Sequence, residues 1–222
     1  MSTLNPAVSP GISIGYALSS VADWLRQITV RVSGRGGSHG SGVIWQKGLI
    51  VTNAHVASSR IHAIEFADGR RGQGRLVGHD PQCDLAALAV DRPFLSVASV
   101  RSARQCRAGE LVIAMGNPID GQQAVSTGII HRPAGRHPFL LADIRLAPGN
   151  SGGPLADAQG NVIGVNSAVV NGLGCAVTSD AVCEFLKAAG LSATPPTKTH
   201  RRPRTDDHPA NHHHSAGTPE AD

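Results

Sequence analysis

The feature that most constrains the fold is a succession of short apolar runs rich in Val and Ile, each bounded by Gly, Pro or polar turn residues. Such runs are typical of β-strands, because β-branched side chains pack well on a pleated surface. The first group consists of ITVRV from Ile28, GVIW from Gly42, LIVTN from Leu49, AIEF from Ala63, GRLVG from Gly74 and LAALAV from Leu85. Six short strands separated by turns predict a small antiparallel barrel.

A second group of runs follows the arginine-rich connection SVRSARQCRAG and predicts a second barrel in tandem with the first. Its members are ELVIAMG from Glu110, AVSTGIIH from Ala124, FLLADIRL from Phe139, NVIGVNSAVV from Asn161 and GCAVTS from Gly174. The segment SDAVCEFLKAAG then predicts a closing helix with Ser179 or Asp180 at its start and Gly190 at its end. We therefore expect an all-β protein of two barrels with a short C-terminal helix.

Composition divides the chain into four parts. Residues 1–18 are expected to form a flexible leader, 19–104 the first barrel preceded by a short helix at 19–26, and 105–191 the second barrel with the closing helix. Residues 192–222 are rich in Pro, Thr, His, Arg and Asp and contain almost no large apolar side chain. This tail is expected to be disordered, and a dedicated role for its histidines at 212–214 or for its arginines is not expected.

Bulk properties limit the possible partners. At 222 residues and 41% hydrophobic, the chain can bury a real core. The net charge of +4 is too modest to make the whole molecule a nucleic-acid-binding surface. No apolar run approaches the roughly 18 residues that a membrane span requires. We therefore expect a polypeptide partner, with no nucleic acid, no membrane and no cofactor.

Cysteine usage and the N-terminus bear on location. The four cysteines are scattered and form no C-x-x-C pair, so we expect thiols and no zinc or other metal site. No Lys or Arg precedes Arg26, and Ser, Gly and Pro interrupt the apolar part of the N-terminus, which makes a poor signal peptide. A cytoplasmic location is therefore expected, with export as the alternative.

The stretch LAPGNSGGPLAD places one serine, Ser151, among Gly149, Gly152, Gly153 and Pro154. Glycine is used where the backbone φ must be positive or where another group approaches the main chain closely. The cluster therefore indicates a functional site, although an ordinary Gly-Pro turn with a hydrogen-bonding Ser is the simpler alternative. A serine hydroxyl becomes a strong nucleophile only when a base removes its proton and a third group orients that base.

The order of the possible partners excludes one nucleophile arrangement. The pattern G-x-S-x-G would also fit the nucleophile elbow of an α/β-hydrolase, which requires a helix directly after the serine and the histidine later in the chain. Here Pro154 leads into a turn and a strand, and the next histidines lie in the tail. The elbow interpretation therefore fails.

The first barrel supplies better partners for Ser151. His55, in IVTNAHVA, lies at the end of an apolar run, and Asp84 immediately precedes a run of six apolar residues. A carboxylate entering an apolar run needs a donor, which an imidazole N–H can provide. Asp80 precedes a proline and is typical of a turn. The competing histidines stand beside polar or turn residues, and they are His39, His62, His79, His131 and His137.

Three motifs together resemble the trypsin-like serine peptidases, closest to the HtrA or DegP-like branch: TNAHV around His55, DLAAL from Asp84 and GNSGGPL around Ser151. The similarity extends from about Gly40 to Leu191 and includes GSGVIW, AMGNP, STGII and GNVIGVNSA. The resemblance implies two six-stranded β-barrels with the active site in the cleft between them. It also implies His55 as base, Asp84 as its orienting group, Ser151 as nucleophile, and the N–H groups of Gly149 and Ser151 as the oxyanion hole.

The resemblance has limits and consequences for substrates. Asn150 stands where digestive enzymes carry an activating acid, so that activation route is not expected, and the roughly thirty residues after Leu191 are too few for a PDZ domain. Arg145 is implied to lie near the floor of the primary specificity pocket, where it would disfavour Lys and Arg. The strand edge implied to pair with substrate consists of Ser167, Ala168 and Val169.

The expected function is that of a serine endopeptidase acting on extended or unfolded polypeptides. Val169 would narrow the pocket, so we expect cleavage after small aliphatic residues, with acidic residues as the second choice through pairing with Arg145. The alternative from another class is a catalytically silent module that binds extended peptides at the same strand edge.

Overall fold

The computed structural model describes residues 10–34, 39–91, 96–117, 123–135 and 137–191, with side chains from residue 15 onward. The expectations for residues 1–9 and for the tail at 192–222 lie outside the described residues. The elements are, in chain order, α1 (Pro10–Ile28), β1 (Thr29–Ser33), β2 (His39–Gln46), β3 (Leu49–Thr52), β4 (Ile61–Glu65), β5 (Arg71–Asp80), β6 (Leu85–Ala89), the 3₁₀ helix η2 (Ala103–Gln105), β7 (Leu111–Gly116), β8 (Ala124–Arg132), β9 (Phe139–Asp143), β10 (Pro154–Asp157), β11 (Val162–Val170), β12 (Leu173–Thr178) and α2 (Ser179–Ala188).

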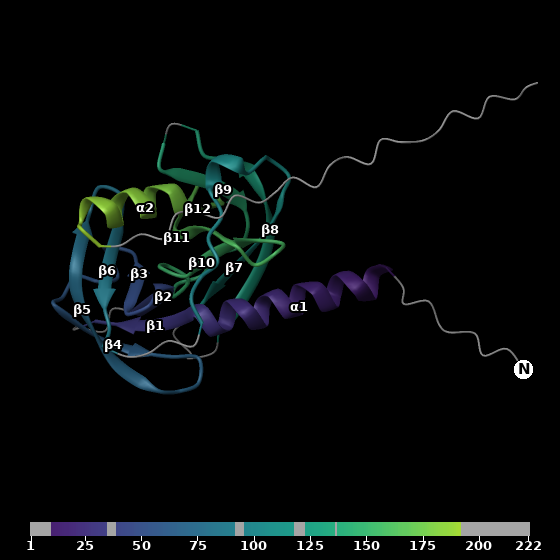
Figure 1. The fold of residues 1–222 in the computed structure, drawn as a ribbon. Coiled ribbons are helices and arrows are strands. Elements are labelled where there is room, and N and C mark those ends of the chain that lie inside the picture. The colour runs from purple at the N-terminus through teal and green to yellow at the C-terminus, as the bar shows by residue number, and fades with distance from the viewer. Residues whose placement is uncertain (1–9, 35–38, 92–95, 118–122, 136, 192–222) are drawn as a thin grey trace, which may run out of the picture.

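The strands form two closed barrels of six antiparallel strands each, in the orders β1-β2-β3-β6-β5-β4 and β10-β11-β12-β9-β8-β7 (Figure 1). The expected all-β fold with two tandem barrels is confirmed. One strand, β10, had no counterpart among the apolar runs of the sequence. It has four residues and begins with Pro154, and it closes the second barrel by pairing with both β7 and β11.

The burial pattern distinguishes the strands between the barrels from those on the outside. All four residues of β3 and of β10 are buried, as are six consecutive residues of β2. Their two faces meet two different cores, one inside a barrel and one between the barrels. In contrast, β4 and β8 alternate between buried or half-buried and exposed positions, because one face of each meets solvent. The continuous apolar runs of the sequence therefore mark the strands at the junction.

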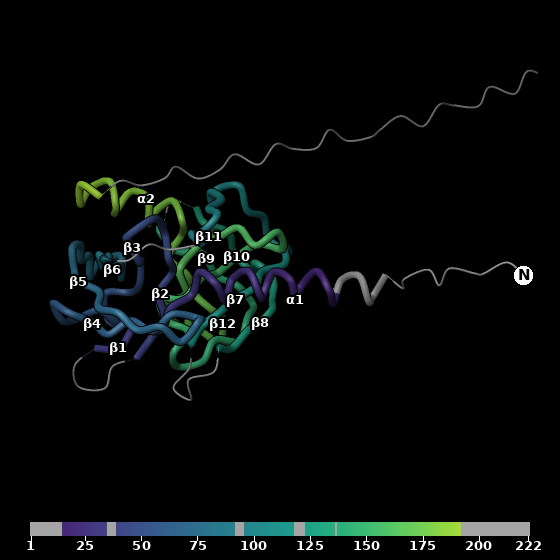
Figure 2. The backbone as a smooth tube through the Cα atoms, turned by 60° about the horizontal axis from the view of Figure 1, so that its bottom comes forward, coloured from purple at the N-terminus to yellow at the C-terminus, as the bar shows by residue number. Residues whose placement is uncertain are grey.

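The helices differ from the expectation in their boundaries. α1 begins at Pro10, so residues 10–18 of the expected leader are helical. It contacts β1, β2 and β7 and so lies across the junction of the barrels (Figure 2), with Leu25 and Ile28 fully buried there. This burial overrides the low helix propensity of the Gly and Ser residues before it. In the described chain, no helix is long and apolar enough to cross a bilayer.

The closing helix α2 begins at Ser179, as expected, and the residue that caps it is Thr178. The Thr178 side chain accepts a hydrogen bond from the Ala181 N–H at 3.2 Å. The helix contacts β6 of the first barrel and β11 and β12 of the second. Both helices therefore bridge the two barrels.

An ion-pair cluster fixes the connection between the barrels. Arg101 follows the first barrel, and its guanidinium lies 3.1 Å from a Glu110 oxygen and 3.2 Å from Asp157 Oδ2. The side chains of Arg101 and Asp157 are only 12% and 4% exposed, so removal of either partner would leave a buried charge. The connection is thereby tied to the second barrel, where Val100 also pairs with Val162.

Helix α1 is predicted to be part of the cooperative core. Leu25→Ala should lower the free energy of unfolding by about 2 to 5 kcal/mol, because it removes a fully buried side chain between the barrels. Tyr16→Ala, at a position 71% exposed on the same helix, should change it by less than about 0.5 kcal/mol. Urea denaturation measures both, and equal effects would show that α1 does not stabilise the core.

Candidate active site

The Ser151 turn connects β9 to β10 and requires its glycines. Gly149 and Gly152 adopt φ values of 99° and 86°, in the left-handed region that favours glycine. A Cβ atom at Gly152 would overlap the Ser41 carbonyl oxygen and the Thr52 hydroxyl. The glycines around Ser151 thus serve both purposes that the sequence suggested, positive φ and close approach, and the approaching group belongs to the first barrel.

Ser41 of β2 holds this turn from the opposite barrel. Its N–H donates to the Ser151 carbonyl at 2.8 Å, and its hydroxyl donates to the Gly149 carbonyl at 2.7 Å. The Asn117 N–H, which follows β7, donates to the Ser41 hydroxyl at 2.8 Å. In the described part of the chain, the N–H groups of Gly149 and Ser151 donate to no acceptor. These two donors are therefore available to a bound oxygen atom.

His55 and Asp84 meet because β3 and β6 are neighbours in the first barrel. His55 follows β3 and Asp84 immediately precedes β6, and the strands pair from Thr52 opposite Ala86. The His55 ring Nδ1 lies 2.9 and 3.0 Å from the two Asp84 carboxylate oxygens. The backbone N–H of His55 also donates to one of these oxygens, at 3.2 Å. Asp84 takes a positive φ of 54°, and Asn53 Nδ2 donates to its carbonyl at 3.0 Å.

The other histidines make different contacts. His39 meets the Ser33 hydroxyl, His62 meets the backbone of Ser59, and His79 meets the Ala54 carbonyl. Within the described segments, His55 is the histidine that pairs with a carboxylate. The geometry thus singles out the histidine that the motifs favoured.

Ser167 connects Asp84 to Ser151. The register between β11 and β12 shifts between Asn166 and Ala168, which removes Ser167 from the regular ladder. Its hydroxyl donates to Asp84 Oδ2 at 2.5 Å, and its carbonyl accepts the Ser151 hydroxyl at 3.0 Å. Among the described residues, the Ser151 hydroxyl is bonded to this carbonyl and not to His55.

Asp84 and His55 change each other's ionisation. Burial opposes ionisation of Asp84, but hydrogen bonds from His55 and Ser167 outweigh it and lower the pKa of this carboxyl below its usual value. The hydrogen bond to Asp84 raises the pKa of His55 above 6.5, against a smaller opposing effect of burial. Asp84 is therefore ionised at neutral pH and stabilises an imidazolium at His55.

The predicted substrate edge is open on one side. β10 pairs with β11 only as far as Val165, so Ala168 to Val170 are paired only with β12, and Ser167, at the register shift, is in neither ladder. Val169 is 54% exposed on this edge, and Ala168 is exposed beside it. The backbone of these residues can accept an additional extended chain.

Arg145 lies exposed in the connection from β9 to Ser151, and it forms no ion pair within the described segments. The residues on either side of Arg145 line an apolar surface instead. A Cβ at Gly174, the strand partner of Val169, would lie 2.6 Å from a methyl group of Ile144 and 3.2 Å from one of Leu146. The surface next to the Val169–Gly174 strand pair is therefore apolar. Ile144 and Leu146 were not predicted from the sequence, where only their place beside Arg145 distinguishes them.

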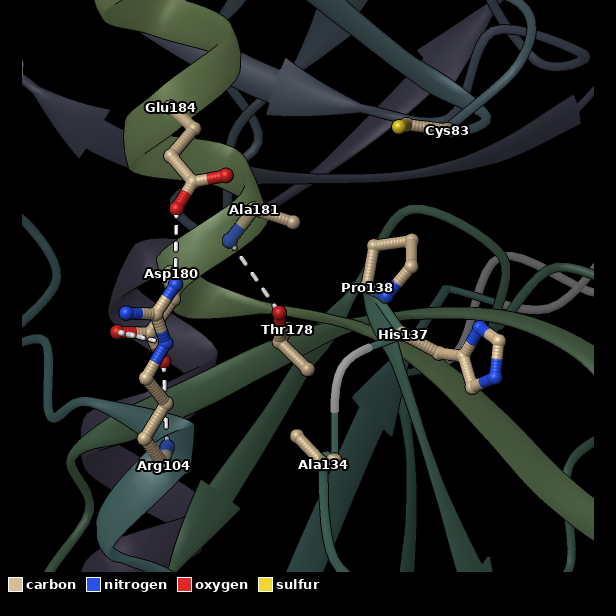
Figure 3. Close-up of a pocket in the computed structure, with 10 residues that line it drawn as sticks. Cys83, Arg104, Ala134, His137, Pro138, Thr178, Asp180, Ala181 and Glu184 are labelled. Atoms are coloured by element: carbon tan, nitrogen blue, oxygen red, sulfur yellow. Dashed lines mark hydrogen bonds and ion pairs between the residues drawn. The ribbon is translucent and has the colours of Figure 1, made fainter.

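A cavity of about 500 Å³ lies beside Cys83, the residue before Asp84 in the chain, and against the start of α2 (Figure 3). Its charged groups pair with one another, since Arg104 lies 2.9 Å from Glu184 and 3.9 Å from Asp180. The four cysteines are free thiols, and burial raises the pKa of Cys106 and Cys183 to about 11. No three His, Cys, Asp or Glu side chains in the described ranges are arranged to hold a metal ion.

A family comparison agrees with this geometry. The model of the trypsin-like peptidase domain matches residues 40–165, which include His55, Asp84 and Ser151. The chain belongs to the trypsin-like peptidase family. Within that family it is 36% identical over 142 residues to a probable periplasmic serine endoprotease, DegP-like, of Chlamydia trachomatis, and 34% identical over 185 residues to the putative serine protease HhoA of Synechocystis.

The similarity to these trypsin-like peptidases covers different shares of each protein. The alignments cover 60% and 74% of this chain, but only 28% and 46% of the DegP-like protein and of HhoA. Among solved structures, the HtrA-type protease AlgW with a tripeptide matches with a TM-score of 0.71 and 31% identity, over 77% of this chain and 62% of that one. The chain thus spans less than half the length of these two curated relatives.

The ionisation of His55 is predicted to depend on Asp84. A carboxylate stabilises the protonated imidazole, so the pKa of His55 should lie above 6.5 and should fall in Asp84→Asn. Asp80→Asn is the matched control, because Asp80 ends β5 and its carboxylate accepts hydrogen bonds from the N–H groups of Gln82 and Cys83 instead. NMR titration of the histidine ring protons measures the change. An unaltered His55 titration in Asp84→Asn would contradict the assignment of this pair.

Proposed function

We propose that the protein is a serine endopeptidase in which Ser151 is the nucleophile, His55 the general base and Asp84 the group that orients His55. The observation that carries this proposal is the position of Asp84. Its carboxylate bonds to His55 of the first barrel and to Ser167 of the second, and the Ser167 carbonyl holds the Ser151 hydroxyl. One carboxylate thereby connects the base to the strand that holds the nucleophile.

The reaction proceeds in two acyl-transfer steps. Once the Ser151 hydroxyl turns from Ser167 to His55 Nε2, the imidazole removes its proton and Oγ attacks the scissile carbonyl. The N–H groups of Gly149 and Ser151 bind the resulting oxyanion, each contributing about 3 to 4 kcal/mol to transition-state stability. His55 then protonates the leaving amine. In the second step His55 removes a proton from water, which attacks the acyl-enzyme, and the protonated His55 returns the proton to Ser151 as the acid product leaves. Because His55 must be neutral to act, activity rises with pH through its raised pKa.

The substrate is an extended or unfolded segment of polypeptide. The open edge of β11 from Ser167 to Val170 supports this class, because it can bind only a chain whose own backbone groups are unpaired. The tripeptide named with AlgW and the endoprotease names of the relatives agree with a peptide ligand.

Small aliphatic side chains are the proposed preference before the scissile bond. The apolar neighbours of Gly174, which are Ile144 and Leu146, support this choice, and Val169 limits the size of the side chain that can enter. Arg145 is exposed and has no partner within the described segments, so an acidic side chain that draws it inward is the second choice.

Loss of the nucleophile is predicted to abolish the reaction. Ser151→Ala should lose all labelling by a fluorophosphonate probe and reduce peptide turnover by roughly 10⁴ to 10⁶. Ser126→Ala, on β8, provides a serine-to-alanine control that should label normally. If neither wild type nor Ser151→Ala were labelled while both bound the same peptides, the protein would be a peptide-binding module instead of an enzyme.

The second prediction of this proposal concerns specificity. Cleavage of a peptide library should occur mainly after Val, Ala or Ile and rarely after Lys or Arg, which would meet the like charge of Arg145. Dominant cleavage after Asp or Glu would show that Arg145 reaches the substrate, and Arg145→Gln should then remove that preference. Dominant cleavage after basic residues would contradict the assignment of the pocket.

A further inference from the structure

The proposed carboxylate, Asp84, has a backbone conformation that glycine adopts more easily than aspartate. Its φ of 54° lies in the left-handed region, which aspartate tolerates better than most residues but less well than glycine. Asp84 is the last residue of the turn that joins β5 to β6, and the residues that close this turn, Asp80 and Leu85, are paired. A glycine would suit the turn but would supply no carboxylate. The surrounding structure must therefore hold Asp84 in this conformation.

Asn53 provides such a hold from the neighbouring segment of the first barrel. It directly follows β3 and is completely buried, and its Nδ2 donates to the Asp84 carbonyl oxygen at 3.0 Å. Because a carbonyl oxygen only accepts hydrogen bonds, the amide must present its nitrogen to it. The bond therefore ties the backbone of Asp84, at the entry to β6, to the end of β3.

The backbone of Asn53 also organises the segment that carries His55. Its carbonyl accepts hydrogen bonds from the N–H groups of Val56 and Ala57 at 3.2 and 3.1 Å, which closes the turn that contains His55. The backbone N–H of His55 donates to Asp84 Oδ1, and the His55 ring bonds to the same carboxylate. Asn53 thus contacts the segment of the proposed base with its backbone and the segment of the carboxylate with its side chain.

The Asn53 amide is present at an energetic cost. Its Oδ1 is buried and has no hydrogen-bond partner among the described residues. A buried acceptor without a partner destabilises the folded state, and an apolar side chain of the same shape would avoid this cost. The cost indicates that the amide serves the candidate site more than the stability of the barrel.

We propose that Asn53 is a positioning residue whose side-chain amide fixes the left-handed conformation of Asp84, and thereby the contact of its carboxylate with His55. This inference rests on the proposed function, in which that contact orients the base. Without the amide, Asp84 can relax toward negative φ, which turns its side chain relative to β6. The carboxylate then no longer accepts hydrogen bonds from the ring and from the backbone of His55 together.

Asn53→Ala tests the proposal by removing the donor. The kcat for a fluorogenic peptide with Val before the scissile bond should fall about ten- to a hundredfold at an unchanged KM, as expected when a catalytic group moves by about 1 Å. In an NMR titration of the ring protons, the pKa of His55 should fall toward 6.5, because the carboxylate that raises it has moved.

Asn53→Leu separates the lost hydrogen bond from the cavity that alanine leaves. Leucine has the branched shape of asparagine and fills the space, but it donates no hydrogen bond. It should therefore show the same loss of kcat and the same fall of the His55 pKa as Asn53→Ala. Melting temperatures establish that each variant is folded.

Asn161→Ala is the matched control in the second barrel. Both polar atoms of the Asn161 amide are bonded, since Nδ2 donates to Asp157 and Oδ1 accepts from the Ser99 hydroxyl. Its removal should lower the melting temperature, because these bonds are lost, and should leave kcat and the His55 titration unaltered.

Three results would overturn the proposal: a folded Asn53 variant with the kcat and His55 titration of wild type, a loss of kcat without a change in that titration, or an equal fall of the His55 pKa in Asn161→Ala. Failure of the proposed function gives a different pattern, namely no fluorophosphonate labelling of wild type. A fall of the His55 pKa in Asn53→Ala of an unlabelled protein would keep the positioning role of Asn53 and refute the enzyme.

Discussion

The contact between Ser41 and the Ser151 turn is the constraint on which the rest of the site depends. The proposed base and carboxylate belong to the first barrel and the proposed nucleophile to the second, so neither barrel alone contains the whole candidate site. Ser41 fixes the turn by two hydrogen bonds, and Gly152 permits the approach because it lacks a side chain. The contact uses the carbonyls of Gly149 and Ser151, whose N–H groups bond to no acceptor among the described residues, and the proposed oxyanion binding requires such free donors.

The elements that bridge the two barrels explain how such a close contact between them is maintained. α1 and α2 each contact both barrels, and the core between the barrels contains buried residues from both helices. Arg101, held by Glu110 and Asp157, adds a buried charge pair that stabilises the connection only in one geometry. Such a pair contributes more to the definition of one arrangement than to stability, because desolvation of both charges offsets their attraction.

Local signals in the sequence indicated the three proposed site residues. Glycines mark Ser151, and the ends of apolar runs mark His55 and Asp84. The bonds of Ser167 to Asp84 and to Ser151 could not be predicted, because the bulge that frees Ser167 from the ladder depends on the register of β11 against β12. β10 was not predicted because it is short and starts with proline. The helix expected at 19–26 was too short because the stability of α1 comes from burial of Leu25 and Ile28 and not from the propensity of its first half.

The bond from the Ser151 hydroxyl to the Ser167 carbonyl has a kinetic consequence. In the free protein the hydroxyl donates to Ser167 and not to His55, the proposed base, and each 1.4 kcal/mol or so of preference for that rotamer would lower the reactive population about tenfold. An extended chain that pairs along the β11 edge brings an N–H donor to the same carbonyl. Its arrival competes for the acceptor and releases the hydroxyl, so the ligand itself would shift the rotamer equilibrium toward the reactive state. Occupancy of the edge and readiness of the nucleophile are thereby coupled through a single oxygen atom.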